Sequence, residues 1–170
     1  GQINEPAHKT IDASGLHVLP GFVDIHTHYD GQATWDQEMG PSSWHGVTTA
    51  LMGNCGVTFA PCRPADRPLL AAMMETVEDI PREAILGGLP WDWEDYGGYL
   101  DSIERLRPGI NLCGLVGHSA LRFYVMGERG AVHTEAPTAE EMARMGTLLE
   151  EALKAGALRA GSDQRGGGGE

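Results

Sequence analysis

The stretch "GFVDIHTHYD", residues 21–30, sets two histidines one residue apart at the end of an apolar run. The β-branched and aromatic side chains of residues 21–26 predict a strand buried in a parallel sheet. Because strand side chains alternate with a period of two, His26 and His28 point to the same side, as does Asp24. Two imidazoles placed in this way can converge on one metal ion, or they can simply form a polar strand end.

Further strands and helices are expected on both sides of this stretch. The apolar runs at 47–56 ("VTTALMGNCG") and 110–118 ("INLCGLVGH") predict two more strands. Amphipathic patterns predict helices at 67–80, 93–106 and 138–156, the last with Thr138 and Glu141 as a capping box and Gly156 as its stop. Strands that alternate with helices are typical of an α/β fold with a parallel sheet, and a fourth strand is expected after Gly156.

The two ends of the chain differ from this pattern. Residues 10–20 predict a short strand, a turn at Ser14–Gly15 and a second short strand. The last residues, "LRAGSDQRGGGGE", have no apolar periodicity and four consecutive glycines, which is typical of a flexible linker.

Composition excludes several classes of function. The net charge of −12 comes from acids spread along the chain, so no basic face is available for nucleic acid, and small molecules or proteins are the expected partners. No apolar run of about 18 residues is present, so no membrane span is expected. The three cysteines, Cys55, Cys62 and Cys113, cannot all pair and show no CxxC spacing. A reducing, cytoplasmic location is therefore predicted.

The stretch "LPGFVDIHTHYDG" resembles the first barrel strand of the amidohydrolase superfamily, where Pro-Gly, two hydrophobic residues and Asp-x-His-x-His open the metal site. The runs "TWDQEMGPSSWHGVTTALMGNCGVTFAP" and "LVGHSALRFYVMG" resemble the branch of the N-acyl-D-amino-acid deacylases, or D-aminoacylases. The resemblance covers residues 11–158. It implies a remnant of a small β-sandwich domain at 1–19 and the N-terminal part of a metal-dependent (β/α)₈ TIM-like barrel at 20–158, with a disordered Gly-rich tail at 159–170.

The same resemblance implies a set of zinc ligands. Cys55, in the "GNCG" stretch, matches a cysteine ligand of this branch, and His26 and His28 match the histidine pair. A thiolate is a strong zinc ligand, whereas the alternative is a buried cysteine that acts as a small hydrophobic residue. In the family these three residues do not all bind the same ion. Two further histidine ligands and the general-base aspartate come from later strands, so no catalytic residue is expected in this chain. Asp30 could orient an imidazole.

Two residues are candidates for substrate binding. His118 ends the third predicted strand and matches a Gly-His of the family, although a polar strand end is the alternative. Arg122 has the planar fork that suits a substrate carboxylate, but a surface ion pair would use it equally well. Four tryptophans could line an apolar acyl pocket or anchor loops over the barrel rim; these are Trp35, Trp44, Trp91 and Trp93.

The implied function is zinc-dependent hydrolysis of the amide bond of a small N-acyl-D-amino acid. A relative acting on another linear or cyclic amide, an inactive or partner-dependent fragment, and a metal-binding or redox module remain as alternatives. A barrel needs about 200 residues or more, and the family's continuation after "GAL" is replaced here by "RAGSDQRGGGGE". We therefore expect a truncation or an altered reading frame. An incomplete barrel would leave strand edges exposed and favour self-association.

Overall fold

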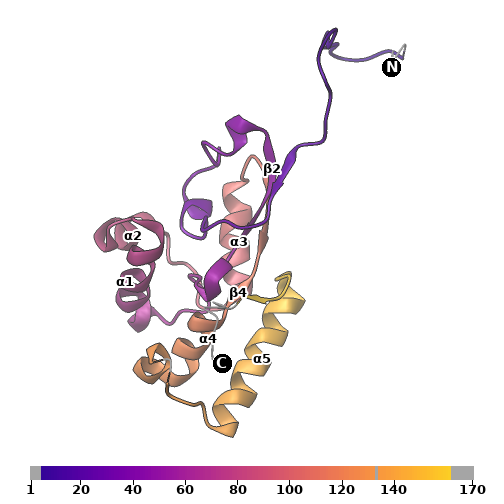
Figure 1. Cartoon of the computed structure of the whole chain (residues 1–170). Coiled ribbons are helices and arrows are strands. Elements are labelled where there is room, and N and C mark those ends of the chain that lie inside the picture. Colours follow the sequence, from indigo (N-terminus) through magenta and orange to yellow (C-terminus); the bar gives the residue numbers. More distant parts are fainter. Residues whose placement is uncertain (1–4, 133, 162–170) are drawn as a thin grey trace, which may run out of the picture.

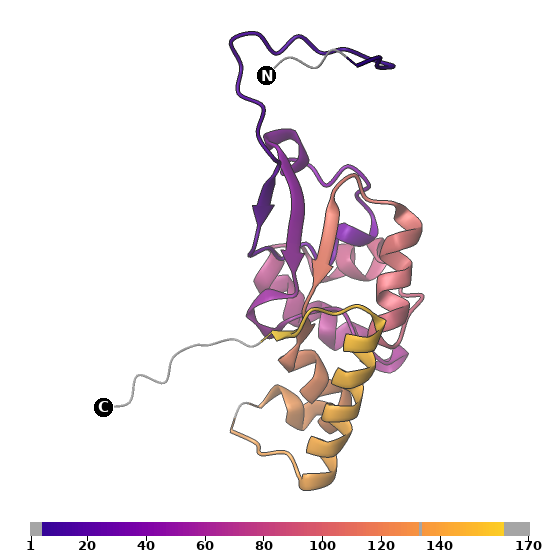
Figure 2. The same cartoon turned by 90° about the vertical axis from the view of Figure 1, so that its right-hand side faces the viewer.

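Parallel strands added in sequence order form the centre of the protein. The computed structural model describes residues 5–132 and 134–161. Strands β1 (Phe22–Asp24), β2 (Val47–Met52) and β3 (Asn111–Gly114) form one sheet in the order β1-β2-β3, and both pairs are parallel. Beyond Leu115, β4 (Val116–Gly117) pairs in parallel with β5 (Ala160–Gly161). Figure 2 shows β1, β2 and β3 running side by side in the same direction, as in the first strands of an α/β barrel.

Helices follow these strands and pack beside them (Figure 1). The predicted helices at 67–80, 93–106 and 138–156 are confirmed within a few residues at each end. A short helix between the first and second predicted ones, and another directly after β4, are additional. The α-helices are α1 (Arg67–Glu78), α2 (Arg82–Gly88), α3 (Tyr96–Leu106), α4 (His118–Met126) and α5 (Ala139–Ala155). Short 3₁₀ turns are η1 (Gln32–Thr34), η2 (Ser43–His45), η3 (Asn54–Gly56), η4 (Pro64–Asp66) and η5 (Gly127–Ala131).

The ends of α5 are the ones that the sequence predicts. The Thr138 hydroxyl accepts the backbone N–H of Glu141 at 3.2 Å, and the Glu141 carboxylate accepts the Thr138 N–H at 2.8 Å. At the other end, the N–H of Gly156 donates to the carbonyl of Ala152 at 3.1 Å. The capping box satisfies N–H groups that would otherwise lack a partner, and such a cap stabilises a helix by about 1 kcal/mol.

An aromatic cluster lies in the core. Trp93 packs on Tyr99 with ring centroids 5.1 Å apart, and Phe59 meets Trp91 edge to face at 5.6 Å. The indole N–H of Trp93 donates to the carbonyl of Phe59 at 2.9 Å. Trp91 and Trp93 are therefore buried anchors, as one of the two interpretations of the tryptophans predicts.

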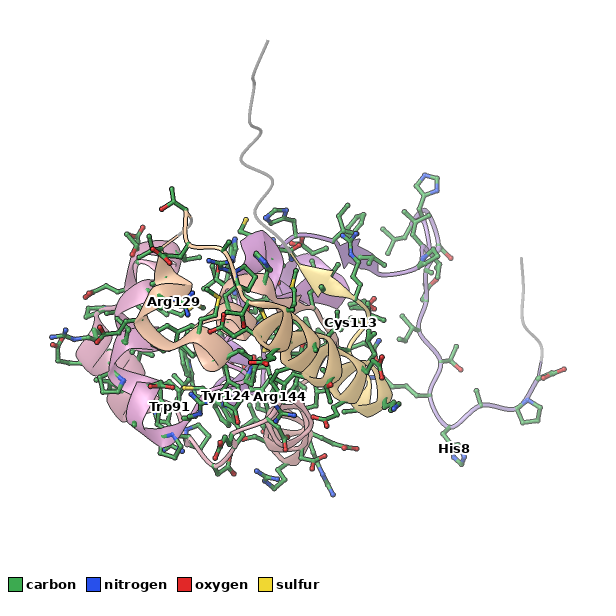
Figure 3. The ribbon with its side chains drawn as sticks, turned by 90° about the horizontal axis from the view of Figure 1, so that it is seen from below. His8, Trp91, Cys113, Tyr124, Arg129 and Arg144 are labelled. Carbon is green, nitrogen blue, oxygen red and sulfur yellow. The ribbon has the colours of Figure 1, made fainter. Side chains whose placement is uncertain are left out.

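The N-terminal segment does not form the two short strands predicted for residues 10–20. The turn at Ser14–Gly15 is present, but the flanking residues are irregular and exposed, and Val18 keeps 82% of its surface accessible. Figures 1 and 3 show this segment extending away from the body of the protein, with His8 on it. A strand needs a neighbour for its hydrogen bonds, and no strand of the described residues lies beside this segment.

Strand β1 is an exposed edge, and the prediction of a buried strand is wrong for this chain. Phe22 and Val23 keep 64% and 61% of their surface accessible, because β1 pairs only with β2 among the described strands. The apolar pattern identified the strand but could not reveal how many neighbours it has. At the other end, Ala160 and Gly161 form β5, although the sequence predicts a tail at 159–170; residues 162–170 lie outside the described part.

Two expectations from composition can be compared with the structure. Cys55, Cys62 and Cys113 are all free thiols. Within the described ranges, no helix has the length and hydropathy that crossing a membrane requires.

Candidate metal centre

Three side chains with metal-binding atoms meet where β1 and β2 end. His26 and His28 follow β1, and Cys55 lies in the turn η3 directly after β2. Because the two strands are parallel, their carboxyl ends share one edge of the sheet. One ligand atom from each of the three residues lies within 4.8 Å of the others. The structure thus brings together the three residues that the sequence predicted as ligands.

The spacing within this cluster suits a zinc ion. The Cys55 Sγ atom lies 3.4 Å from Nε2 of His26. Bond lengths of about 2.0–2.3 Å to a tetrahedral zinc imply ligand atoms about 3.3–3.7 Å apart, so this pair already has the required separation. The two imidazole rings have centroids 5.6 Å apart and an interplanar angle of 70°. A sulfur and two imidazole nitrogens form a donor set that favours zinc over magnesium or calcium.

His28 contributes a further observation that fits a metal. Its Nδ1 atom is buried and has no hydrogen-bond partner among the described residues. Burial, followed by the nearby His26, lowers the pKa of His28 below its usual value. The neutral imidazole is the form that offers a lone pair to an ion. A buried polar atom without a partner is unfavourable, and coordination of the ring would compensate part of that cost.

The backbone at Cys55 is unusual for a residue with a side chain. Cys55 has φ 56° and ψ 16°, which is the left-handed region. Gly53 and Gly56, on either side, also have positive φ values of 81° and 77°. A left-handed conformation costs a non-glycine residue about 1–2 kcal/mol, and strain of this kind is found most often at functional sites. Cys55 is also accessible to solvent, so the alternative of a buried cysteine that acts as a small hydrophobic residue is wrong.

Asp30 supports the turn that carries Cys55. Its side chain is 1% exposed, and Oδ2 accepts the backbone N–H of Gly53 at 3.0 Å. No imidazole is bonded to this carboxyl group in the described part of the chain, so its partner is the cysteine turn. Burial raises the pKa of Asp30 to about 7, although the bond from Gly53 opposes that rise.

The raised pKa predicts a stability that decreases with pH in the metal-free protein. The folded state keeps the Asp30 proton up to about pH 7, whereas the unfolded chain releases it near 3.8. The stabilisation is therefore complete below about pH 4 and is lost as the pH rises to about 7, by at most about 4 kcal/mol. The measurement is urea unfolding with chelator present from pH 4 to 8, compared with Asp30→Asn. The variant keeps an oxygen for Gly53, and its advantage in stability should grow with pH; equal pH profiles would contradict the prediction.

The two predicted substrate residues lie outside this cluster. His118 is the exposed first residue of α4, rather than the end of a strand. Arg122 is buried, and its guanidinium donates to the carbonyl oxygens of Gly130, Val132 and Glu135. The alternative prediction, that Arg122 forms an ion pair on the surface, is therefore wrong, because its three partners are backbone carbonyl groups. Substrate binding by His118 and Arg122 remains a prediction.

A hollow beside His28 combines Trp35, which the sequence singled out, with residues that it did not. The hollow has a volume of about 430 Å³ and includes Trp35 among its lining residues. The other lining residues are Tyr29, Gln32, Val77 and Ile80. Val77 lies at the end of α1, and Ile80 follows that helix. Both are about 50 residues from His28 in the sequence, so no local pattern predicts that they lie beside it. Of the two exposed tryptophans, Trp35 and Trp44, only Trp35 lines this hollow.

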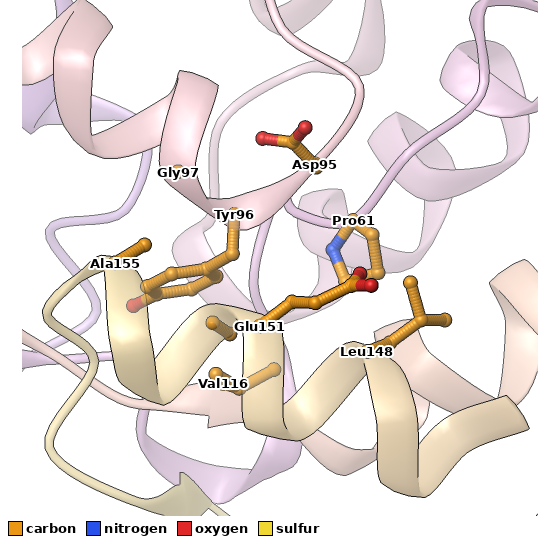
Figure 4. A pocket seen from close by; sticks show the side chains of 9 residues that line it. Pro61, Asp95, Tyr96, Gly97, Val116, Leu148, Glu151 and Ala155 are labelled. Atoms are coloured by element: carbon orange, nitrogen blue, oxygen red, sulfur yellow. The ribbon is translucent and has the colours of Figure 1, made fainter. Parts of the chain in front are cut away.

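A second hollow lies between α3 and α5 and is separate from the metal cluster. Figure 4 shows Asp95 and Tyr96 at the start of α3, with Glu151 and Leu148 of α5 on the opposite wall. Its volume is about 270 Å³, and none of its lining residues belongs to the cluster. It does not contribute to the candidate site.

Parallel strands added in order, with His26, His28 and Cys55 at their carboxyl edge, are typical of the first part of an α/β barrel. The family model described as "Amidohydrolase family" matches residues 9–166, and the chain belongs to that family. The predicted resemblance is confirmed.

Proteins similar to this chain agree with that assignment. The D-aminoacylase of Alcaligenes xylosoxydans xylosoxydans is 37% identical over 152 residues, which are 89% of this chain and 28% of that protein. A solved D-aminoacylase mutant D366A in complex with CuCl₂ has a TM-score of 0.66 at 30% identity, covering 85% of this chain and 27% of that one. N-acyl-D-glutamate deacylase of Bordetella bronchiseptica, solved with zinc and a phosphonate inhibitor, has a TM-score of 0.60 at 31% identity over the same shares. The chain spans about a quarter of the length of the curated relatives that it matches.

Proposed function

We propose that these residues form the first part of a zinc-dependent amidohydrolase that hydrolyses the amide bond of N-acyl-D-amino acids. The observation that carries the proposal is the approach of the ligand atoms of His26, His28 and Cys55 to within 4.8 Å. Their position at the carboxyl edge of parallel strands, where barrel active sites lie, supports the same function. Similarity to a D-aminoacylase and to an N-acyl-D-glutamate deacylase supports the substrate class.

The residues of this chain would bind and orient rather than transfer protons. When bound at such a site, zinc polarises a carbonyl group and lowers the pKa of a water molecule. The family resemblance implies that these three ligands do not all bind one ion. In this chain their ligand atoms lie within 4.8 Å of one another, so His26, His28 and Cys55 would hold zinc together, with the exposed side of the cluster open to substrate. The hollow lined by Trp35, Val77 and Ile80 would take an apolar part of the substrate against His28. His118 is proposed as a substrate contact on the family resemblance, and Arg122 because its planar guanidinium suits a substrate carboxylate.

The proton-transfer groups of the reaction belong to the whole protein. The resemblance implies a general-base aspartate and two further histidine ligands from later strands, and the proposal assigns none of these roles to a residue of this chain. The activity proposed here is therefore that of a barrel in which further residues face the cluster of His26, His28 and Cys55.

A chimera tests the proposed function. This chain would replace the matching 152 residues of the Alcaligenes D-aminoacylase, and release of free amino acid from N-acetyl-D-leucine would be measured beside its L enantiomer. We expect D-selective hydrolysis that His26→Ala reduces by more than about 100-fold, since a ligand is lost.

The control for the chimera is an exposed histidine outside the cluster. His17→Ala changes an exposed side chain in the N-terminal segment and should leave the rate unchanged. A chimera that folds and binds zinc but releases no D-amino acid would contradict the proposed function.

A second candidate is a fragment that functions only with a partner, and the exposed edge of β1 favours it. Phe22 and Val23 remain accessible on a strand with one described neighbour. Free strand edges with apolar side chains favour pairing with another chain. Self-association through this edge is part of this proposal.

Charging the edge should suppress self-association. We expect Val23→Lys to shift the chain toward monomer in size-exclusion chromatography with light scattering, because a charged edge strand opposes pairing. Met142→Lys is the matched control, at a residue of α5 that is 57% exposed. This variant should have the same elution profile as the unchanged chain. If Val23→Lys and the parent chain have the same mass distribution, the edge is not the contact.

Three partner and location predictions complete the proposal. A small N-acyl amino acid is the proposed ligand, and the net charge of −12 supports the absence of a nucleic-acid partner. The free thiols support a reducing, cytoplasmic location, which remains a prediction.

A further inference from the structure

We infer that Asn54 is a positioning residue that holds the histidine loop and the cysteine turn in the arrangement that a metal needs. The inference rests on the proposed metal site, but the arrangement itself can be measured without metal. Asn54 precedes Cys55 in the chain and is 8% exposed. It is a neutral amide, so its effect comes from hydrogen bonds and not from charge.

The amide of Asn54 joins the two loops directly. Its Nδ2 atom donates to the carbonyl of Thr27 at 3.2 Å and to the carbonyl of Leu51 at 2.8 Å. Thr27 lies between His26 and His28. One side chain, adjacent to the cysteine ligand, therefore bonds the peptide group that separates the two histidine ligands.

The two carbonyl groups depend on Asn54 to different extents. The Leu51 carbonyl also accepts the backbone N–H of Thr27 and its hydroxyl, each at 3.0 Å. It keeps partners if the amide is removed. The Thr27 carbonyl has Asn54 Nδ2 as the donor that the structure assigns to it. The bond to Thr27 is thus the link between the ligand loops that is lost when the Asn54 amide is removed.

This link acts on a turn that would otherwise relax. Cys55 is held in a left-handed conformation that costs a non-glycine residue about 1–2 kcal/mol. Such a conformation persists only where the surrounding structure fixes it. Asp30 fixes the N–H of Gly53 on one side of the turn, and the Asn54 amide fixes the residue directly before Cys55. In the intact turn, the Cys55 Sγ atom lies 3.4 Å from Nε2 of His26. Without the Asn54 amide, we expect this distance to increase.

A second asparagine, which is exposed, provides a control for the loss of an amide bond to β2. The Asn111 amide donates to the carbonyl of Thr48 at 3.0 Å, near the start of β2. It therefore makes the same type of bond to the same strand, at the end away from η3. Asn111→Ala should affect the sheet without affecting the ligand loops.

The first test uses cobalt as the metal probe. Titration of the 170-residue chain with Co²⁺ would follow the near-ultraviolet thiolate-to-cobalt absorption band, which reports the Cys55 sulfur. We expect Asn54→Ala to weaken Co²⁺ binding by about 10–100-fold and to reduce the band, because partners that orient metal ligands have effects of this size. Asn111→Ala should change the affinity by less than about twofold. Unchanged binding and an unchanged band in Asn54→Ala would overturn the inference.

The second test needs no metal and separates the inference from the proposed function. In the metal-free chain, nuclear Overhauser cross-peaks between Cys55 and the His26 ring should be present in the unchanged chain and in Asn111→Ala. They should be absent in Asn54→Ala and in Asn54→Asp, which keeps the shape but not the donor. Cross-peaks that persist in both Asn54 variants overturn the inference. If the cross-peaks disappear in both variants but the unchanged chain binds no Co²⁺, the inference is supported and the metal site is contradicted.

Discussion

Cys55→Ala is expected to lower the zinc affinity of the chain by more than about 100-fold. The reason is the loss of a thiolate from a cluster whose ligand atoms lie within 4.8 Å of one another. Loss of a group that merely orients a ligand costs about 10–100-fold, so loss of the ligand itself should cost more. The measurement is competition between the chain and a chromophoric chelator for zinc.

The other cysteines provide the control for this experiment. Cys113, a free thiol on β3, is replaced by alanine in a parallel titration that should match the unchanged chain. Equal zinc affinities for Cys55→Ala and Cys113→Ala would mean that the Cys55 thiol is not a ligand, whatever the histidines do.

Gly53→Ala is expected to destabilise the fold by about 3 kcal/mol or more. A Cβ atom at this position would lie 2.3 Å from the carbonyl oxygen of Leu115, which is backbone and cannot rotate away. The φ of +81° adds further strain for a residue with a side chain. The loss combines a steric clash and a strained conformation, both among the mechanisms behind large destabilisations. The measurement is the free energy of unfolding in urea.

A glycine in a helix provides the control, because its replacement by alanine should stabilise the protein instead of destabilising it. Gly146 lies within α5, and an added Cβ would meet no atom within 4 Å. Gly146→Ala should therefore stabilise the protein by about 1 kcal/mol, since alanine is favoured over glycine in a helix interior. If Gly53→Ala unfolds at the same urea concentration as the unchanged chain, the close approach of Gly53 to the Leu115 carbonyl is contradicted.

Sequence patterns predicted the elements whose signals are local. The capping box of Thr138 and Glu141 is formed by two residues three positions apart, and the structure has it as expected. The pair His26 and His28 could be identified because two histidines one residue apart are also a local signal, although β1 ends at Asp24, before both of them. Cys55 was added to this pair by the family resemblance alone, and the shared edge of the parallel strands explains why the three residues meet.

Features that depend on residues far apart in the sequence could not be predicted from local patterns. The burial of β1 depends on how many strands flank it, and the pattern of Phe22 and Val23 is the same for an edge strand and a central one. The three carbonyl partners of Arg122 lie 8 to 13 residues further along the chain, in η5 and in the segment after it, which have no sequence pattern that points to Arg122. The helix that begins at His118 was missed, because its apolar residues continue those of the preceding strand.

The most direct measurement of the central claim is the metal content and coordination of the purified chain. Elemental analysis with zinc-edge X-ray absorption would count the ions and identify the donor atoms. We predict about one zinc per chain, with one sulfur at about 2.3 Å and imidazole nitrogens at about 2.0–2.1 Å. A chain that retains no zinc after equilibrium dialysis, or one whose zinc has only oxygen neighbours, would contradict a centre formed by His26, His28 and Cys55.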